Sequence, residues 1–107
     1  MKEIFELDVY RLSETLSDLI WNVYDEWTDK AKKTIGYQII RSSDSIAANI
    51  AEGYGRYTPK DRKMFYRYAR GSFEETKCWL RKTIRRGILS EEKSRNALRL
   101  LTNLDPN

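Results

Sequence analysis

Histidine is absent from this 107-residue sequence, and only one cysteine is present. Without histidine there is no histidine-based catalytic triad, no histidine-bound catalytic zinc and no Glu-x-x-His di-iron site. A single cysteine excludes an intrachain disulfide and a thiolate metal cluster. These absences leave a binding, structural or assembly role, or an enzyme that relies on carboxylates or lysine. Of these we expect a protein without enzymatic activity, metal or cofactor.

Proline and glycine are also scarce, with two and five residues, which argues against a turn-rich β fold. No apolar run approaches the ~18 residues of a transmembrane helix, so we expect no membrane partner. Residues 1–8 carry acids where a signal peptide would be apolar, so we expect a cytoplasmic protein. The 40% of hydrophobic residues is too high for a disordered chain. The length fits one domain that spans residues 1–107.

Charge is divided unevenly along the chain. Residues 1–53 contain six basic and ten acidic side chains, a net charge of 6 − 10 = −4. Residues 54–107 contain fourteen basic and six acidic side chains, a net charge of 14 − 6 = +8. Such a division within one small domain favours a polyanionic partner or charge-complementary self-assembly over a merely solvated surface.

Apolar residues recur at the three-and-four spacing of amphipathic helices along the whole chain. This spacing predicts four helices at about residues 8–27, 34–52, 59–86 and 91–104. The expected core includes Val9, Leu16, Ile20, Val23 and Trp27, then Ile35, Ile39, Ile46 and Ile50, then Phe73 and Leu80, and finally Ala97, Leu98, Leu101 and Leu104. Three long helices and a short fourth, joined by short turns, predict an all-α, up-down-up-down antiparallel four-helix bundle.

Local signals mark several helix ends. Asp8 is expected to cap the first helix. The run Thr-Pro-Lys-Asp at residues 58–61 is a strong start signal for the third, with threonine at the N-cap, proline next and an acid in the first turn. The polar stretch Thr28–Lys33 predicts a turn. Gly53 is expected to end the second helix in the left-handed conformation.

Cations gather on one side of the predicted third helix. On a helical wheel at 100° per residue, six of them lie opposite the apolar side and extend over about 33 Å. We call this set the cationic ridge: Lys63, Arg67, Arg70, Lys77, Arg81 and Arg85. Glu74 interrupts it, and Arg62, Lys82 and Arg86 widen it. A surface of this length and sign is suited to backbone phosphates of RNA or DNA; an ordinary solvated helix face is the alternative.

Aromatic residues outside the apolar stripes suggest two further surfaces. Tyr66 borders the cationic ridge, and Tyr54 and Tyr57 lie in the loop before it, where they could stack on unpaired bases or simply pack. On the wheel of the first helix, Trp21 and Tyr10 fall well away from the core residues. Large aromatics in such positions indicate an oligomer interface.

Small and polar residues dominate the second half of the predicted second helix. Arg41, Ser45 and Glu52 share one face, with Asn49 near the helix end. Such a composition favours a buried polar network or a subunit seam over catalysis. Gly71 lies in the middle of the third helix, where glycine costs about 1 kcal/mol relative to alanine. This cost predicts that a neighbouring helix approaches closely at Gly71.

Two stretches resemble a known bacterial family. They are Gln38–Arg41 with Ser45-Ile46, Asn49–Gly53 and Gly55-Arg56, and the run Ala69–Glu75. The resemblance spans about residues 5–104 and is to the four-helix-bundle proteins encoded in intervening sequences of 23S ribosomal RNA genes. Those proteins are related to the accessory variability protein of diversity-generating retroelements. The motif positions are Arg41, Ser45, Asn49, Glu52, Gly53, Arg56 and Gly71.

This resemblance implies a homopentameric ring with a basic surface and no enzymatic activity. In the retroelement branch it also implies binding of nucleic acid and of a reverse transcriptase. Two hypotheses follow for this chain. It is an oligomeric protein that binds RNA or DNA through the cationic ridge, or it is a protein-interaction scaffold or accessory subunit with no direct role on nucleic acid.

Overall fold

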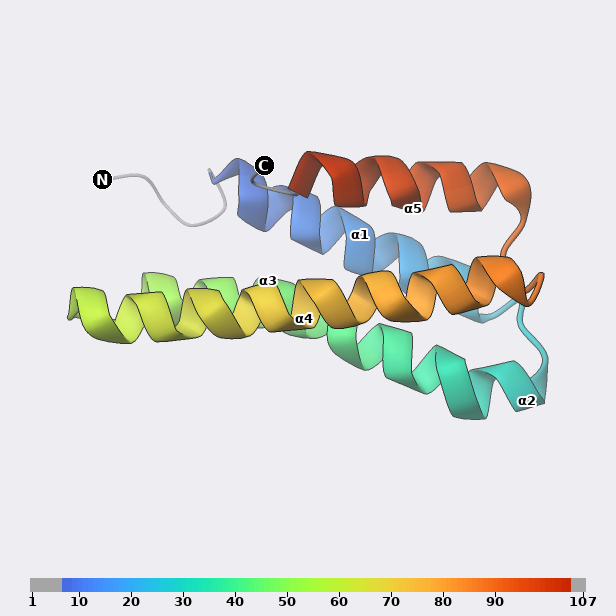
Figure 1. Ribbon diagram of the computed structural model, residues 1–107, viewed down its shortest axis with the longest axis horizontal. Coiled ribbons are helices and arrows are strands. Elements are labelled where there is room, and N and C mark those ends of the chain that lie inside the picture. Colours follow the sequence, from blue (N-terminus) through green and yellow to red (C-terminus); the bar gives the residue numbers. More distant parts are fainter. Residues whose placement is uncertain (1–6, 105–107) are drawn as a thin grey trace.

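The computed structural model describes residues 7–104, and every regular element in this part of the chain is helical (Figure 1). The four long helices are α1 (Asp8–Tyr24), α3 (Tyr37–Tyr54), α4 (Pro59–Arg85) and α5 (Glu91–Leu104). A short helix, α2 (Asp29–Ala31), and a π-helical turn, η2 (Lys32–Gly36), lead into α3. The prediction of an all-α fold with four main helices is confirmed. Within residues 7–104, no helix is both long and apolar enough to cross a membrane.

The helices pack unequally on one another. α3 and α4 lie side by side, and α1 contacts both α3 and α5 (Figure 1). α5 packs chiefly on α1 and meets α4 at few positions. α4 has 27 residues, about 40 Å of helix, and so runs nearly the full 44 Å length of the molecule. One flank of α4 is therefore covered by α3, whereas the flank toward α5 is only partly covered.

The segment between α1 and α3 differs from the sequence prediction. The first helix begins at Asp8, but Leu7 occupies the N-cap position and Asp8 is the first helical residue. The helix ends at Tyr24 rather than near Trp27. The predicted turn at residues 28–33 is wrong, because Thr28 Oγ1 accepts a hydrogen bond from the Ala31 backbone N–H at 3.2 Å and starts a new helix at Asp29. A threonine cap followed by an acid is a helix start signal that outweighs the polar composition of the stretch.

The expectation for Gly53 is also wrong. α3 continues through Tyr54 to a cap at Gly55, and Gly53 is helical and buried. A side chain there would collide with Tyr66 of α4, because a Cβ on Gly53 would lie 2.7 Å from the Tyr66 ring carbon Cε1. Gly53 therefore provides room for an aromatic ring. In the described part of the chain, a left-handed backbone occurs at Gly87, which follows the cap of α4 with φ 68°.

Gly71 does not mark a close approach, contrary to the sequence prediction. It is exposed on α4, and a Cβ at this position would meet no atom of another helix within 4 Å. The seam between α3 and α4 runs instead through small hydroxyl side chains. Thr76 Oγ1 donates to Ser42 Oγ, and Ser72 Oγ donates to Ser45 Oγ, each at 2.9 Å. Short side chains at these positions let the two helices approach closely and satisfy their buried polar atoms.

Candidate nucleic-acid interface

α4 is the element that positions the candidate site, and its local sequence fixes where it starts. The Thr58 side chain accepts a hydrogen bond from the Asp61 backbone N–H at 3.1 Å, and Pro59 occupies the first turn. One side of the helix is buried: Ala69, Phe73, Thr76, Leu80 and Thr83. The remaining sides carry the cations.

The cationic ridge keeps its charges accessible. Five of its six side chains are exposed, and Lys77 is half-buried. Glu74 lies between the two cations that it pairs with, 3.5 Å from Arg70 and 3.3 Å from Lys77. Among residues 7–104, no carboxylate lies within ion-pair distance of the other four members. These charges have no internal role in the described structure and are available to an anionic partner.

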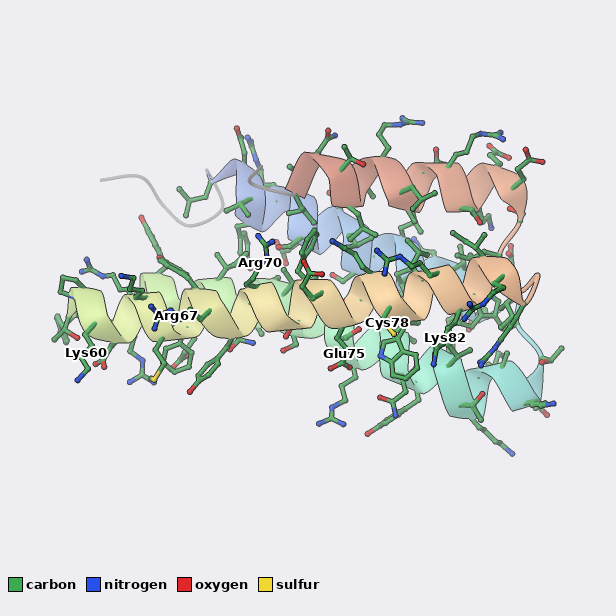
Figure 2. The ribbon with its side chains drawn as sticks, viewed as in Figure 1. Lys60, Arg67, Arg70, Glu75, Cys78 and Lys82 are labelled. Atoms are coloured by element: carbon green, nitrogen blue, oxygen red, sulfur yellow. The ribbon has the colours of Figure 1, made fainter. Side chains whose placement is uncertain are left out.

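The helical wheel placed the whole ridge opposite the core, but in the structure part of the ridge lies elsewhere. Arg70 projects from α4 toward α1, while Glu75 lies on the opposite side of the helix (Figure 2). The wheel treats the core as one direction, but α4 packs mainly on α3 and leaves its α5 flank open. The ridge therefore borders this open flank.

Two cavities occupy the open flank of α4. The first has a volume of about 490 Å³ and an almost entirely apolar lining, with Lys63, Arg67 and Arg70 at its border. The second, of about 170 Å³, lies between α4 and α5 and is bordered by Lys77 and Arg81. Phe73 contributes to both. We call the two together the α4 cleft.

Cations of the ridge are held close to the aromatic ring that the two cavities share. The Arg70 guanidinium lies 5.8 Å and the Lys77 ammonium 5.1 Å from the centroid of the Phe73 ring. Contacts of this kind are cation–π interactions, worth about 0.5–1 kcal/mol at exposed sites. The α4 cleft therefore combines a cationic border with an apolar floor.

The loop that precedes α4 is organised by arginines. Arg56 pairs with Glu52 at 2.5 Å and lies over the Phe65 ring, 4.6 Å from its centroid. Arg62 donates through Nε to the Arg56 carbonyl oxygen at 2.8 Å. Arg62, which was expected to widen the ridge, thus fixes the loop. Tyr57 at the loop is 96% exposed.

Further predicted residues are placed as follows. Tyr66 is partly exposed; its ring lies next to Gly53 on α3 and borders the first cavity. Asn49 donates through Nδ2 to the Ser45 carbonyl oxygen and hydroxyl, each at 2.9 Å. Arg41 and Arg86 are exposed. The motif residues therefore divide between the α3–α4 seam and the surface.

α1 and α3 present an acidic surface that also carries aromatic rings. Trp21 is 64% exposed, whereas Tyr10 is half-buried against the edge of the core. Burial, together with the Asp18 carboxylate on α1, raises the pKa of Asp44 on α3. A raised pKa means that the folded protein holds this negative charge at a cost, which a cation brought by another molecule would offset.

The residues that open the α4 cleft were not recognisable from the sequence. Val9 and Leu98 were assigned to the core, yet they are 44% and 46% exposed and each lines one of the two cavities. Phe73 is buried as predicted but also forms part of the cleft floor. Their apolar spacing is that of any core stripe, so no local signal distinguishes them.

Comparisons with known proteins agree with the helical fold. A crystal structure of a protein of unknown function from the S23 ribosomal protein family, from Bacteroides thetaiotaomicron, superposes with a TM-score of 0.79. It is 26% identical in sequence, and the match covers 90% of each chain. No curated protein matches the sequence. The family model described as 23S rRNA-intervening sequence protein matches residues 5–106, so the chain belongs to that family.

Proposed function

We propose that this chain is a non-enzymatic protein that binds nucleic acid through the cationic ridge of α4. The observation that carries the proposal is the ridge itself, six cations along about 33 Å of one helix with Glu74 as the single acid among them. Neutralising backbone phosphates releases counterions, which drives binding without a need for base-specific contacts. The family description, 23S rRNA-intervening sequence protein, is consistent with a nucleic-acid partner.

The proposal includes self-assembly. We propose that the subunit is an up-down-up-down bundle and that five copies form a ring with Trp21 in or near the seam. An exposed tryptophan favours burial against another molecule. A cation brought by that molecule would offset the cost of the Asp44 charge, whose pKa is raised. The α1–α3 surface and the ridge lie on different helices, and the proposal requires a ring in which the ridge stays accessible.

The acidic, aromatic surface of α1 and α3 also supports a second candidate function. In that reading the chain is a scaffold or accessory subunit that binds another protein, for example a reverse transcriptase, and its basic ridge is incidental. The resemblance to the accessory protein of retroelements belongs to this alternative.

Filter binding on a structured RNA over a series of salt concentrations separates the two functions. For six phosphate contacts we expect the plot of log affinity against log salt to have a slope of about −4 to −5. A scaffold without a role on nucleic acid would show weak binding with a shallow slope at every salt concentration.

A further inference from the structure

The α4 cleft combines features that phosphate binding alone does not require. Phosphates need only cations, yet the cations here stand at the border of two cavities, the first of which has an almost entirely apolar lining. The first cavity, at about 490 Å³, is within the range of ligand-binding pockets. An apolar cleft open to water carries a cost in free energy, which a bound group with an apolar surface would offset.

The order of the residues along α4 matches one kind of polymer. From Lys63 to Arg81 the cleft follows about 27 Å of helix, with cations at its border on both sides of Phe73. A single-stranded nucleic acid presents the complementary pattern, since anionic phosphates alternate with flat, largely apolar bases that are free of a partner strand. A duplex keeps the faces of its bases stacked inside and presents only phosphates, sugars and base edges to a protein surface.

We propose that the α4 cleft binds single-stranded nucleic acid, with the phosphates on the cationic ridge and bases against the apolar floor around Phe73. This inference rests on the proposed function, which it narrows from any nucleic acid to unpaired strands. Tyr66, which is 43% exposed and lines the first cavity, supplies aromatic surface for stacking. Stacking tolerates any base because every base has a π-face.

The experiment compares the affinity of the protein for three ligands of equal length: a uridine strand, the same strand built of abasic ribose phosphates, and a duplex. A length of about ten nucleotides is within the size range of known single-strand sites. The abasic strand has the same charges and lacks the bases. We expect it to bind about tenfold or more weakly than the uridine strand, with the same salt slope, because stacking does not release counterions. We expect the duplex to bind more weakly than the uridine strand.

Uncharged variants locate the effect within the protein. Val9→Gln and Leu98→Gln place a polar group in the first and second cavity, while Met64→Gln is the matched control, because Met64 is 39% exposed on α4 and lines neither cavity. The two cleft variants should narrow the difference in affinity between uridine and abasic strands by about fivefold or more each, the low end of the range for one lost stacking contact. The control should leave it unchanged.

Each other outcome overturns the inference in a recognisable way. Equal affinity for uridine and abasic strands, or tighter duplex binding, would show that the ridge binds phosphates while the cleft stays outside the complex. That result would leave the proposed function intact. A loss of assembled mass in Val9→Gln or Leu98→Gln would assign the cleft to a second copy of the chain. Absence of binding to all three ligands would remove the proposed function as well.

Discussion

Replacing Arg67, Arg70, Lys77 and Arg81 together by glutamine should flatten the salt dependence of RNA binding by about three units of slope. If the parent and the variant bind alike near 1 M salt, that change corresponds to about a 10³-fold loss of affinity at about 0.1 M. The physical cause is the loss of four released counterions. Folding should survive, because none of the four side chains is buried.

A control variant of equal charge change separates the ridge from net charge. Arg11, Lys30, Lys33 and Arg99 are exposed cations on other elements, and their replacement by glutamine also removes four positive charges. This control should retain most of the parent's slope, since its residues lie outside the ridge. If both variants lose the same affinity, binding depends on overall charge and the ridge has no special part in it.

Trp21→Asp should convert the assembled protein to single chains. Light scattering should give about five times the 12.7 kDa chain mass for the parent and the mass of one chain for the variant. The reason is that Trp21 lies 64% exposed on α1, one helical turn from both Asp18 and Asp25. An added carboxylate in a dry seam would be unpaired and among like charges, which is strongly unfavourable.

Tyr57→Asp is the control for this prediction. It introduces the same charge at another exposed aromatic, in the loop between α3 and α4, and should leave the mass unchanged. A parent protein that is monomeric at micromolar concentration contradicts the proposed ring, as does a Trp21→Asp variant that keeps the full mass.

Features that depend on neighbouring residues could be predicted from the sequence, and features that depend on packing could not. The start of α4 could be predicted from residues 58–61, because a threonine cap, a proline and an acid all stabilise the first turn of a helix. The start of α2 at Asp29 follows the same rule, with Thr28 as its cap. The polar composition of residues 28–33 favoured a turn and led to the wrong prediction there. At Gly53 the deciding neighbour is Tyr66, on another helix, which local sequence does not specify.

The same limit applies to the candidate site. A helical wheel identifies the cations of the ridge, because all of them belong to one helix. The α4 cleft depends on how far α5 stands from α4, which is set by the packing of α5 on α1. Val9 and Leu98 therefore have the pattern of core residues while lining an open cleft.

Lysine footprinting tests the central claim, that the ridge of α4 contacts nucleic acid, most directly. Acetylation with a water-soluble reagent, read by mass spectrometry with and without RNA, reports each lysine separately. Lys63 and Lys77 on the ridge should become protected when RNA binds, while Lys30 and Lys33, exposed on α2 and η2, should react as before. Unchanged reactivity at Lys63 and Lys77 in the RNA complex, or equal protection of all four lysines, would contradict the account.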